Sequence, residues 1–383
     1  MTEAESIETA ASSIKIENIW YLLLYAWDMV RWKGKSKSAV EKSPELLGLL
    51  ATVLTDATQE IIRYQLDRAY TKREAILAGI RGKVDFASSL KLRTFDRGRT
   101  SCSFSDLTVD SLKNRIIRGT LDRLLSDPRL VHANSTQSFE KDLKHRIRRA
   151  VRALEGVTLV PIDAAIFARV QLSPSDRIYA LPLAICSLIY RLQMPAEVNG
   201  DRLMVALLKD KLRFYQLFED FIRNFYKIHL KSHRVQREVL SWGEVPSNSL
   251  VPQMRTDITV IERAPPYSRM VVDTKYSTTT LTDRKKFKSE NLYQIYAYLR
   301  TQEGRGPAFE NADAMLMYPT TETDVDSTMS VQGHSIRVVT VNLSRGWQEI
   351  EAQLLSLIPL PPSANSMRAE IARGVGVHEV FNQ

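Results

Sequence analysis

The chain has 383 residues, with 44% hydrophobic and 25% charged residues, a composition ordinary for globular proteins and long enough for two domains. Its net charge of +9 suits a polyanionic partner such as nucleic acid. Two cysteines exclude a disulfide framework, and the longest apolar run, Ile19–Ala26, is too short to span a bilayer. With no secretory leader pattern either, we expect a cytoplasmic protein without membrane contact.

The first half of the chain has the pattern of a mostly helical domain with short β segments. Met1–Ser13 is polar and small, and is expected to be disordered. Apolar residues at helical spacing predict helices at Ile16–Val30, Pro44–Arg68, Asp110–Leu125, Phe139–Leu154 and Ile178–Leu192. Short β-like runs lie between Arg73 and Leu107. The apolar first helix is expected to lie in a core, with a partner surface as the alternative.

A basic run and a break follow in this half. Lys141–Arg152 is the densest basic run, and Arg148 and Arg149 within it are expected to contact a DNA backbone. The alternative is a solvated helix face or a contact to an acidic partner. The break between Met194 and Gly200 then predicts two domains, residues 1–200 and 201–383.

The second half alternates helices with strands. The predicted elements are the helix Arg202–His233, the strands Val239–Trp242, Met254–Ile261 and Arg269–Tyr276, the helix Lys288–Gln302, the strands Ala314–Tyr318 and His334–Leu343, and the helix Trp347–Ile358. The turn Ala264–Ser268 is expected to join the second and third of these strands into a hairpin.

This hairpin carries the most informative residues of the chain. Asp257 lies on its first strand, and Asp273 on its second strand is followed two positions on by Lys275. Because side chains alternate between the faces of a strand, Asp273 and Lys275 point the same way, roughly 6–7 Å apart. The hairpin would bring Asp257 close to Asp273. Nucleases use this arrangement to hold a divalent metal beside a phosphodiester, and a solvated charged face is the alternative.

The chemistry of such a site follows from the ligands that hard cations prefer. Mg²⁺ binds carboxylate oxygens and water, and usually takes one or two carboxylates from the protein. A bound Mg²⁺, or Mn²⁺ in its place, can activate a water and stabilise charge on the phosphate. A lysine ammonium beside it can orient the water or stabilise the transition state.

Neighbouring helices offer further candidates for the same site. Gln294 and Tyr298 are four residues apart and share a helix face, from which they could hold the lysine, the metal water or a phosphate. The alternative is a core tyrosine beside an exposed glutamine. Upstream, Glu219 borders an apolar helical stripe and could supply a third metal-binding acid. An ordinary surface glutamate, or Asp220 in its place, are the alternatives.

A second basic cluster lies between the acidic strand and the Gln294 helix. Its lysines, Lys285, Lys286 and Lys288, are expected to contact DNA because they are close to the candidate site in the chain.

The order of these elements resembles the PD-(D/E)xK nuclease core, a mixed α/β sheet flanked by helices. The helix with Gln294 and Tyr298 is similar to the QxxxY variant of RecB-like members. Thr256, where the motif name has proline, is a departure from the pattern.

A closer resemblance covers most of the chain. The segments IENIWYLLLYAWD at Ile16–Asp28, RGKVDF at Arg81–Phe86 and CSFSDLTVDSLKNRII at Cys102–Ile117 look like the McrC family, the nuclease subunit of McrBC-type, modification-dependent restriction systems. The later pattern MRTDI…VVDTKY…NLYQIYAY is similar to the nuclease domain of the same family.

The McrC resemblance implies a partner and a division of labour. The N-terminal half would dock on McrB, an AAA+ GTPase that binds modified DNA, and the chain would stimulate that GTPase and cut double-stranded, methylcytosine-containing DNA. The metal acids and lysine of the family carry over to Asp257, Asp273 and Lys275, and less directly to Glu219 and Gln294. The sequence has no GxxxxGK[ST] pattern, so we expect no nucleotide site in this chain.

Two other hypotheses fit the same residues. One is a RecB-like DNA-repair nuclease, which would use the same site without a GTPase. The other is a non-catalytic regulator of an AAA+ motor that keeps a decayed nuclease fold. The presence of both acids and the lysine argues against decay.

Overall fold

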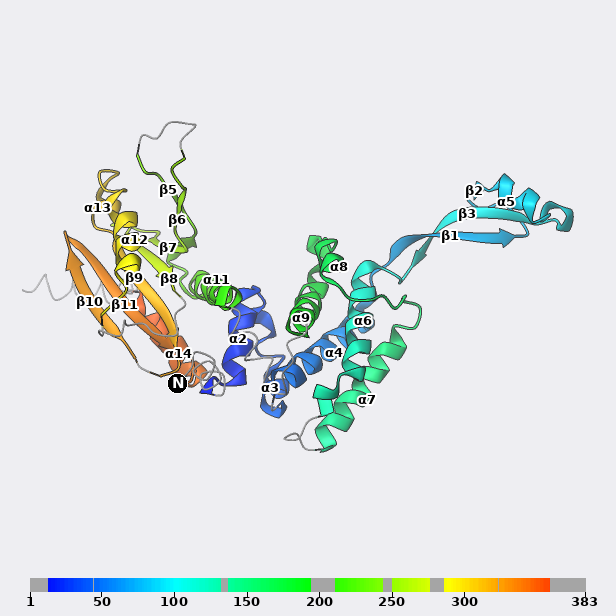
Figure 1. Cartoon of the computed structure of the whole chain (residues 1–383), viewed down its shortest axis with the longest axis horizontal. Coiled ribbons are helices and arrows are strands. Elements are labelled where there is room, and N and C mark those ends of the chain that lie inside the picture. Colours follow the sequence, from blue (N-terminus) through cyan, green and yellow to red (C-terminus); the bar gives the residue numbers. More distant parts are fainter. Residues whose placement is uncertain are drawn as a thin grey trace, which may run out of the picture. The chain divides into compact units, whose positions relative to one another are not determined.

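The computed structural model describes residues 13–43, 45–131, 137–193, 211–243, 250–275, 286–322 and 324–358. The chain divides into two compact units, one of residues 31–206 and one of residues 1–30 together with 207–383 (Figure 1). The combination of a helical N-terminal region and a mixed sheet flanked by helices agrees with the expected fold class. Among the described helices, none has the length and apolar character needed to cross a membrane.

The unit of residues 31–206 is a helical bundle that carries a β arm. Its α-helices are α3 (Lys37–Lys42), α4 (Leu46–Tyr64), α5 (Phe86–Lys91), α6 (Leu112–Ser126), α7 (Gln137–Ala153), α8 (Ala164–Ala168) and α9 (Arg177–Gln193), and its short 3₁₀ turns are η2 (Phe95–Arg97), η3 (Pro128–Val131) and η4 (Pro174–Asp176). The helix α4 packs on α9, α7 and α6. Buried Leu50, Leu54, Leu121 and Ile147 form part of the bundle's core.

The arm differs from the short β segments that were expected. It consists of two nine-residue strands, β1 (Ala69–Leu77) and β3 (Thr100–Thr108), paired antiparallel along their full length, with β2 (Lys83–Val84) on the other side of β3. One face of β1 is exposed and the other is only half-buried, with Arg73 exposed in its middle. Because apolar Tyr70 and Ile76 lie on the exposed face, the sequence lacks the alternation of apolar and polar residues that marks a half-buried strand.

The other unit is built on a six-stranded mixed sheet. Its strands are β4 (His233–Gln236), β7 (Ile258–Glu262), β8 (Arg269–Thr274), β9 (Asp313–Thr320), β10 (Asp326–Val331) and β11 (His334–Asn342), in the order β10-β11-β9-β8-β7-β4. The pairs β8–β9 and β9–β11 are parallel, and the other pairs are antiparallel. The strands β5 (Val239–Leu240) and β6 (Met254–Arg255) form a separate two-stranded sheet.

Helices cover both faces of the parallel part of this sheet, as parallel strands require. The helices of this unit are α2 (Ile16–Ala26), α11 (Lys211–His229), α12 (Ser289–Arg300), α13 (Pro307–Glu310) and α14 (Trp347–Leu357), and η1 (Val30–Trp32) begins at its boundary with the other unit. On one face, Ile295 and Leu299 of α12 pack with Val271 and Leu316. Since strand side chains alternate, residues such as Val272 belong to the other face, and α11 and α14 contact β8 and β11, respectively.

The helix α2 is buried, as expected, but it belongs to the unit that contains the sheet. It packs along α11, where the Asn224 side chain donates to the carbonyl oxygens of Tyr25 and Ala26. The Tyr25 ring stacks on Trp347, with ring centroids 5.6 Å apart. The first helix is thus separate from the N-terminal domain of residues 1–200 in which the sequence placed it. The expected boundary at residue 200 and the expected disorder of residues 1–12 fall outside the described residues.

Three further elements differ from the sequence prediction. The described part of α11 ends at His229, and His233, which was assigned to this helix, begins β4. The predicted strand Met254–Ile261 is divided into β6 and β7. The division occurs at Thr256, whose backbone N–H donates to the Glu238 carbonyl and whose hydroxyl contacts Thr259. The polar edge strand β10 was not predicted at all.

Candidate active site

The two aspartates of the hairpin lie at the same position across the sheet. In the β7–β8 register, Ile258 is paired with Val272, and continuing it by one residue puts Asp257 opposite Asp273. Asp257 precedes β7 at the point where the chain leaves the small β5–β6 sheet. The hairpin predicted from the sequence therefore does bring the two acids together.

Asp273 begins a chain of contacts that runs to α12. The Lys275 Nζ atom lies 2.7 Å from Asp273 Oδ2 and donates to Gln294 Oε1 at 2.8 Å. The Gln294 amide in turn donates to the Tyr298 hydroxyl at 2.7 Å. Strand alternation puts Asp273 and Lys275 on one face of the sheet. The helical period puts Gln294 and Tyr298 on the face of α12 that contacts Lys275. All four residues come together as the sequence analysis expected.

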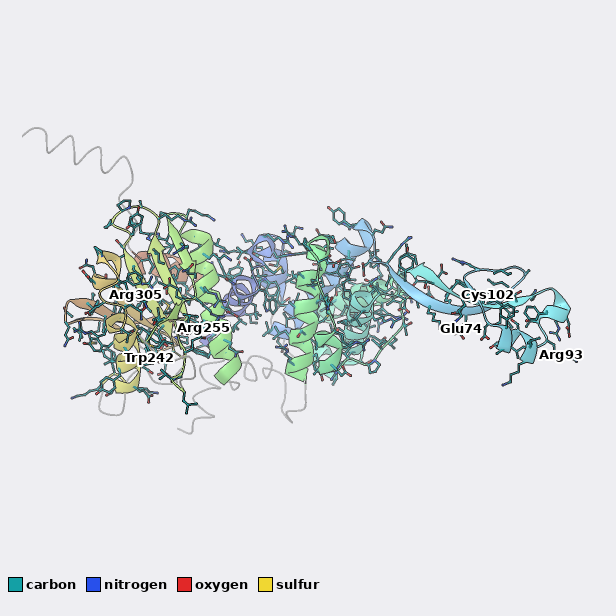
Figure 2. All side chains as sticks on the ribbon, turned by 90° about the horizontal axis from the view of Figure 1, so that it is seen from above. Glu74, Arg93, Cys102, Trp242, Arg255 and Arg305 are labelled. Carbon is teal, nitrogen blue, oxygen red and sulfur yellow. The ribbon has the colours of Figure 1, made fainter. Side chains whose placement is uncertain are left out.

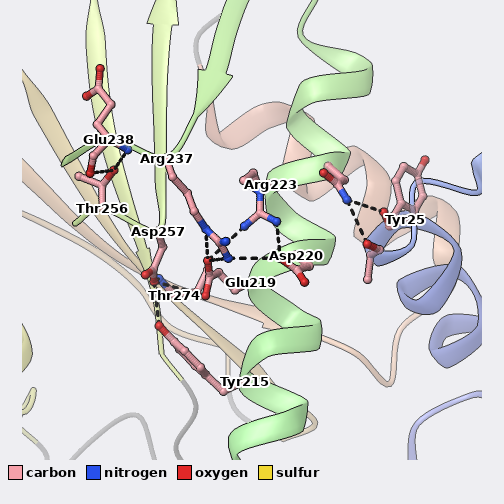
Figure 3. A network of polar contacts seen from close by, with 12 residues as sticks. Tyr25, Tyr215, Glu219, Asp220, Arg223, Arg237, Glu238, Thr256, Asp257 and Thr274 are labelled. Atoms are coloured by element: carbon pink, nitrogen blue, oxygen red, sulfur yellow. Dashed lines mark hydrogen bonds and ion pairs between the residues drawn. The ribbon is translucent and has the colours of Figure 1, made fainter. Parts of the chain in front are cut away.

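Asp257 is held from two directions. Its Oδ2 atom accepts hydrogen bonds from the Thr274 backbone N–H at 2.9 Å, the Thr274 hydroxyl at 3.0 Å and the Tyr215 hydroxyl at 3.1 Å. Tyr215 comes from α11, and Thr274 is the last residue of β8 (Figure 3). These donors fix the orientation of the carboxylate before any ligand is bound.

Glu219 lies on the same helix as Tyr215 and is buried. Its Oε1 atom accepts hydrogen bonds from Arg237 Nε at 2.8 Å and Arg223 Nη1 at 3.1 Å, and Arg237 also bonds it through Nη2. Arg223 and Arg237 reach the neighbouring Asp220 as well (Figure 3). Glu219 is therefore a paired, buried acid, which differs from the surface glutamate that was weighed as its alternative.

The three acids influence one another electrostatically. Burial, followed by the negative charge of Asp257, raises the pKa of Asp273 well above its usual range, against the opposing effect of Lys275. Burial and the Asp257 charge likewise raise the pKa of Glu219, although Arg237 opposes the shift. Negative charge is thus concentrated at one end of the hairpin, where a cation would relieve it.

The carboxylate oxygens of the site fit a hard divalent cation, but the number of protein ligands that they can supply is small. The Lys275 ammonium lies 2.7 Å from Asp273 Oδ2, and among the described residues no other polar group reaches either of the two buried carboxylate oxygens. Buried acceptors of this kind are costly unless a ligand satisfies them. In the described parts of the chain, no group of three or more acidic, histidine or cysteine side chains is close enough to hold a metal ion. Two carboxylates are enough for Mg²⁺, which keeps several waters.

The expected DNA contacts are spread over both units. Arg148 and Arg149 are exposed on α7, in the unit of residues 31–206. Lys286 is exposed and Lys288 half-buried, just before α12. Lys285 lies outside the described residues. Their contact with DNA remains a prediction.

Sequence reasoning missed Tyr215, Thr274 and Arg237. Tyr215 could have been found, because it precedes Glu219 by four residues and so shares its helix face. Thr274 lies between Asp273 and Lys275. Strand alternation predicts that its side chain points to the opposite face, so it was not considered part of the site. Arg237 reaches Glu219 only through the fold, since β4 returns the chain beside α11.

Comparison with known proteins agrees with this architecture. A family described as McrBC 5-methylcytosine restriction system component matches residues 9–319, well over half of the chain. The chain belongs to the McrBC family. The resemblance that the sequence motifs showed is thereby confirmed.

The individual relatives share only a small part of the sequence of this McrBC family member. The Escherichia coli K12 protein named type IV methyl-directed restriction enzyme EcoKMcrBC is 28% identical over 351 residues, which cover 90% of this chain and 97% of that protein. In a half-complex from a tetradecameric assembly of Thermococcus gammatolerans McrB AAA+ hexamers with bound McrC, one chain matches with a TM-score of 0.53 and 17% identity, covering 90% of this chain and 76% of that chain. The likeness to the Thermococcus gammatolerans chain shows a shared fold.

Proposed function

We propose that the chain is the Mg²⁺-dependent endonuclease subunit of a McrBC-type restriction system. It cuts double-stranded, methylcytosine-containing DNA together with an AAA+ GTPase, which it stimulates. One observation carries this proposal. In a member of the McrBC family, Lys275 contacts both Asp273 and Gln294, and Asp257 lies opposite Asp273 on the next strand. This is the set of groups that metal-dependent phosphodiester hydrolysis needs.

Each acid has a distinct role in the proposed site. Asp257 and Asp273 hold the metal, and Glu219 contributes through a coordinated water. When bound, Mg²⁺ or Mn²⁺ supplies positive charge to the phosphate and lowers the pKa of a coordinated water. The raised pKa of Asp273 in the metal-free chain reflects the same crowding of carboxylates that favours the cation.

Lys275 is proposed to donate to the phosphate or to the attacking water. Its ammonium is mostly buried and is fixed by Asp273 and Gln294, so no reorganisation is needed when charge develops. Gln294 is itself oriented by Tyr298, which is 8% exposed. Half-buried Gln294 and buried Tyr298 thus support the lysine.

The unit of residues 31–206 is proposed to dock on the AAA+ partner. Its β arm exposes large apolar side chains at Ile80, Phe86 and Leu90, which are 66–74% exposed, on the arm that carries Glu74, Arg93 and Cys102 in Figure 2. Clustered apolar exposure of this kind marks protein–protein contact sites. A motor partner also fits the sequence, which lacks a Walker-type nucleotide motif.

Co-purification with an AAA+ GTPase of the same family, followed by cleavage assays, tests the proposal. With GTP and Mg²⁺, the wild-type complex should cut methylated DNA and spare unmethylated DNA. Asp257→Ala and Asp273→Ala should abolish cleavage and Lys275→Ala should reduce its rate about 10²–10³-fold, while all three keep GTPase stimulation. Asp28→Asn, at an exposed position, should change neither activity. Cleavage of methylated DNA by the Asp273→Ala complex would show that the site is wrongly assigned.

A further inference from the structure

The hydrogen bonds to Asp257 all reach the same oxygen. Tyr215 and the two donors of Thr274 bond Oδ2, and no hydrogen bond from the described residues reaches Oδ1. An ionised carboxylate has about four acceptor positions, two on each oxygen. Three donors therefore saturate one oxygen of Asp257 and leave the other with its acceptor positions open.

Tyr215 is well placed to hold this orientation. It lies on α11, whose neighbouring side chains Phe214 and Phe218 are fully buried, so its backbone is fixed by the core. A phenol is protonated at neutral pH, so the Tyr215 hydroxyl, 3.1 Å from Asp257 Oδ2, acts as a donor.

Glu219, one helical turn further along, shows the same pattern. Arg223 and Arg237 both bond its Oε1 atom, and no hydrogen bond from the described residues reaches Oε2. Two neighbouring acids are thus each held through one oxygen, with the second oxygen left for another ligand (Figure 3).

We propose that Tyr215 and Thr274 restrict Asp257 to binding metal through one oxygen, and that Tyr215 thereby favours Mg²⁺ or Mn²⁺ over Ca²⁺. Mg²⁺ demands a near-ideal octahedron at 2.0–2.1 Å, whereas Ca²⁺ accepts two-oxygen coordination at 2.3–2.6 Å. Two-oxygen coordination by Asp257 would displace hydrogen bonds that Oδ2 now accepts. Tyr215 is a positioning residue in this role, and the inference rests on the proposed metal site.

The variant Tyr215→Phe removes one donor and keeps the ring. Loss of a hydrogen bond behind a metal ligand typically weakens metal binding about 10- to 100-fold. Because two donors remain, we expect the Kd for Mn²⁺ to rise about tenfold, at the lower end of that range. The Kd for Ca²⁺ should change by less than about threefold, because Oδ2 then accepts two hydrogen bonds instead of three and displacing them for two-oxygen coordination of the larger ion costs less.

Thr274 supplies a second, independent variant. Thr274→Val removes the hydroxyl donor and keeps the backbone N–H, so it should shift the ratio of the two Kd values in the same direction. Thr274→Ser keeps the hydroxyl and should behave as the wild type. Tyr293→Phe is the matched control for Tyr215→Phe, since Tyr293 is 72% exposed on α12.

Isothermal titration calorimetry of the full-length chain with MnCl₂ and with CaCl₂ measures both constants, and thermal melting of the metal-free variants reports folding. A tenfold weaker Mn²⁺ affinity with near-normal Ca²⁺ affinity supports the inference. Equal weakening of both ions, or wild-type affinities in Tyr215→Phe and Thr274→Val, overturns it. If Asp273→Asn binds Mn²⁺ as the wild type does, the proposed metal site fails and the inference with it. If Asp273→Asn loses Mn²⁺ binding while Tyr215→Phe and Thr274→Val bind both ions as the wild type does, the metal site stands and only the role of Tyr215 and Thr274 is refuted.

Discussion

Replacing Asp273 by asparagine should stabilise the metal-free protein while abolishing cleavage. The Asp273 side chain is 1% exposed, and among the described residues its carboxylate is paired with the Lys275 ammonium alone, at 2.7 Å from Oδ2. The nearby charges of Asp257 and Glu219 add to the cost of ionising it. Asparagine has the same shape and no charge, so the substitution removes this cost without leaving a cavity.

The sign follows from the direction of the pKa shift. The folded state raises the pKa of Asp273 above that of the unfolded chain. The protonated side chain therefore favours folding fully below about pH 4, and this contribution is lost as the pH rises through the folded-state pKa. At pH 8 the carboxylate is ionised and the cost is complete. The variant should then be more stable than the wild type.

The magnitude depends on what Lys275 loses. Removing one partner of a buried ion pair is usually destabilising, but the Lys275 side chain is 18% exposed and keeps its bond to Gln294. Relief of a buried charge that has a single cationic partner and one unsatisfied oxygen is worth about 1–3 kcal/mol or more. We expect a net gain of about 1–2 kcal/mol, or roughly 2–8 °C in Tm for a unit of this size.

Thermal melting at pH 8 with and without Mg²⁺ checks this expectation. Ligand at 100 times its Kd stabilises a protein by about 2.7 kcal/mol, so Mg²⁺ should raise the Tm of the wild type above that of Asp273→Asn and leave the variant unchanged. Asp28→Asn, at an exposed position, controls for the loss of a charge. A lower Tm of metal-free Asp273→Asn than of wild type, or an equal response of both to Mg²⁺, would refute the reasoning.

Three other predictions concern single side chains. Lys275→Ala should reduce the cleavage rate about 10²–10³-fold, the loss typical of a transition-state donor, with DNA binding by fluorescence anisotropy nearly unchanged. Asn18 is fully buried and donates to two backbone carbonyls, so Asn18→Ala should lower the free energy of unfolding by about 1–3 kcal/mol in urea denaturation. Bonds from Arg115 hold the pKa of Asp110 below its usual range. The stability that this pair contributes is present above about pH 4 and is lost as the pH falls further, and acid titration of Asp110→Asn should show a smaller loss.

Local periodicity alone accounted for much of the candidate site. The pairing of Lys275 with Asp273 follows from the two-residue repeat of a strand, and that of Gln294 with Tyr298 follows from the helical repeat. The turn after β7 was enough to bring Asp257 beside Asp273. Each of these relations joins residues close in the chain, where geometry depends little on the rest of the fold. Their catalytic roles remain proposals.

The tertiary structure decided what depends on distant segments. The contacts of Tyr215 with Asp257 and of Arg237 with Glu219 join residues 42 and 18 positions apart, and no local pattern encodes such pairs. The place of α2 is also a tertiary fact, because an apolar helix is equally compatible with any core. It packs on α11, although nearly two hundred residues separate them. The sequence determined which groups could form a metal site, and the fold determined which oxygens are held and which are left for a ligand.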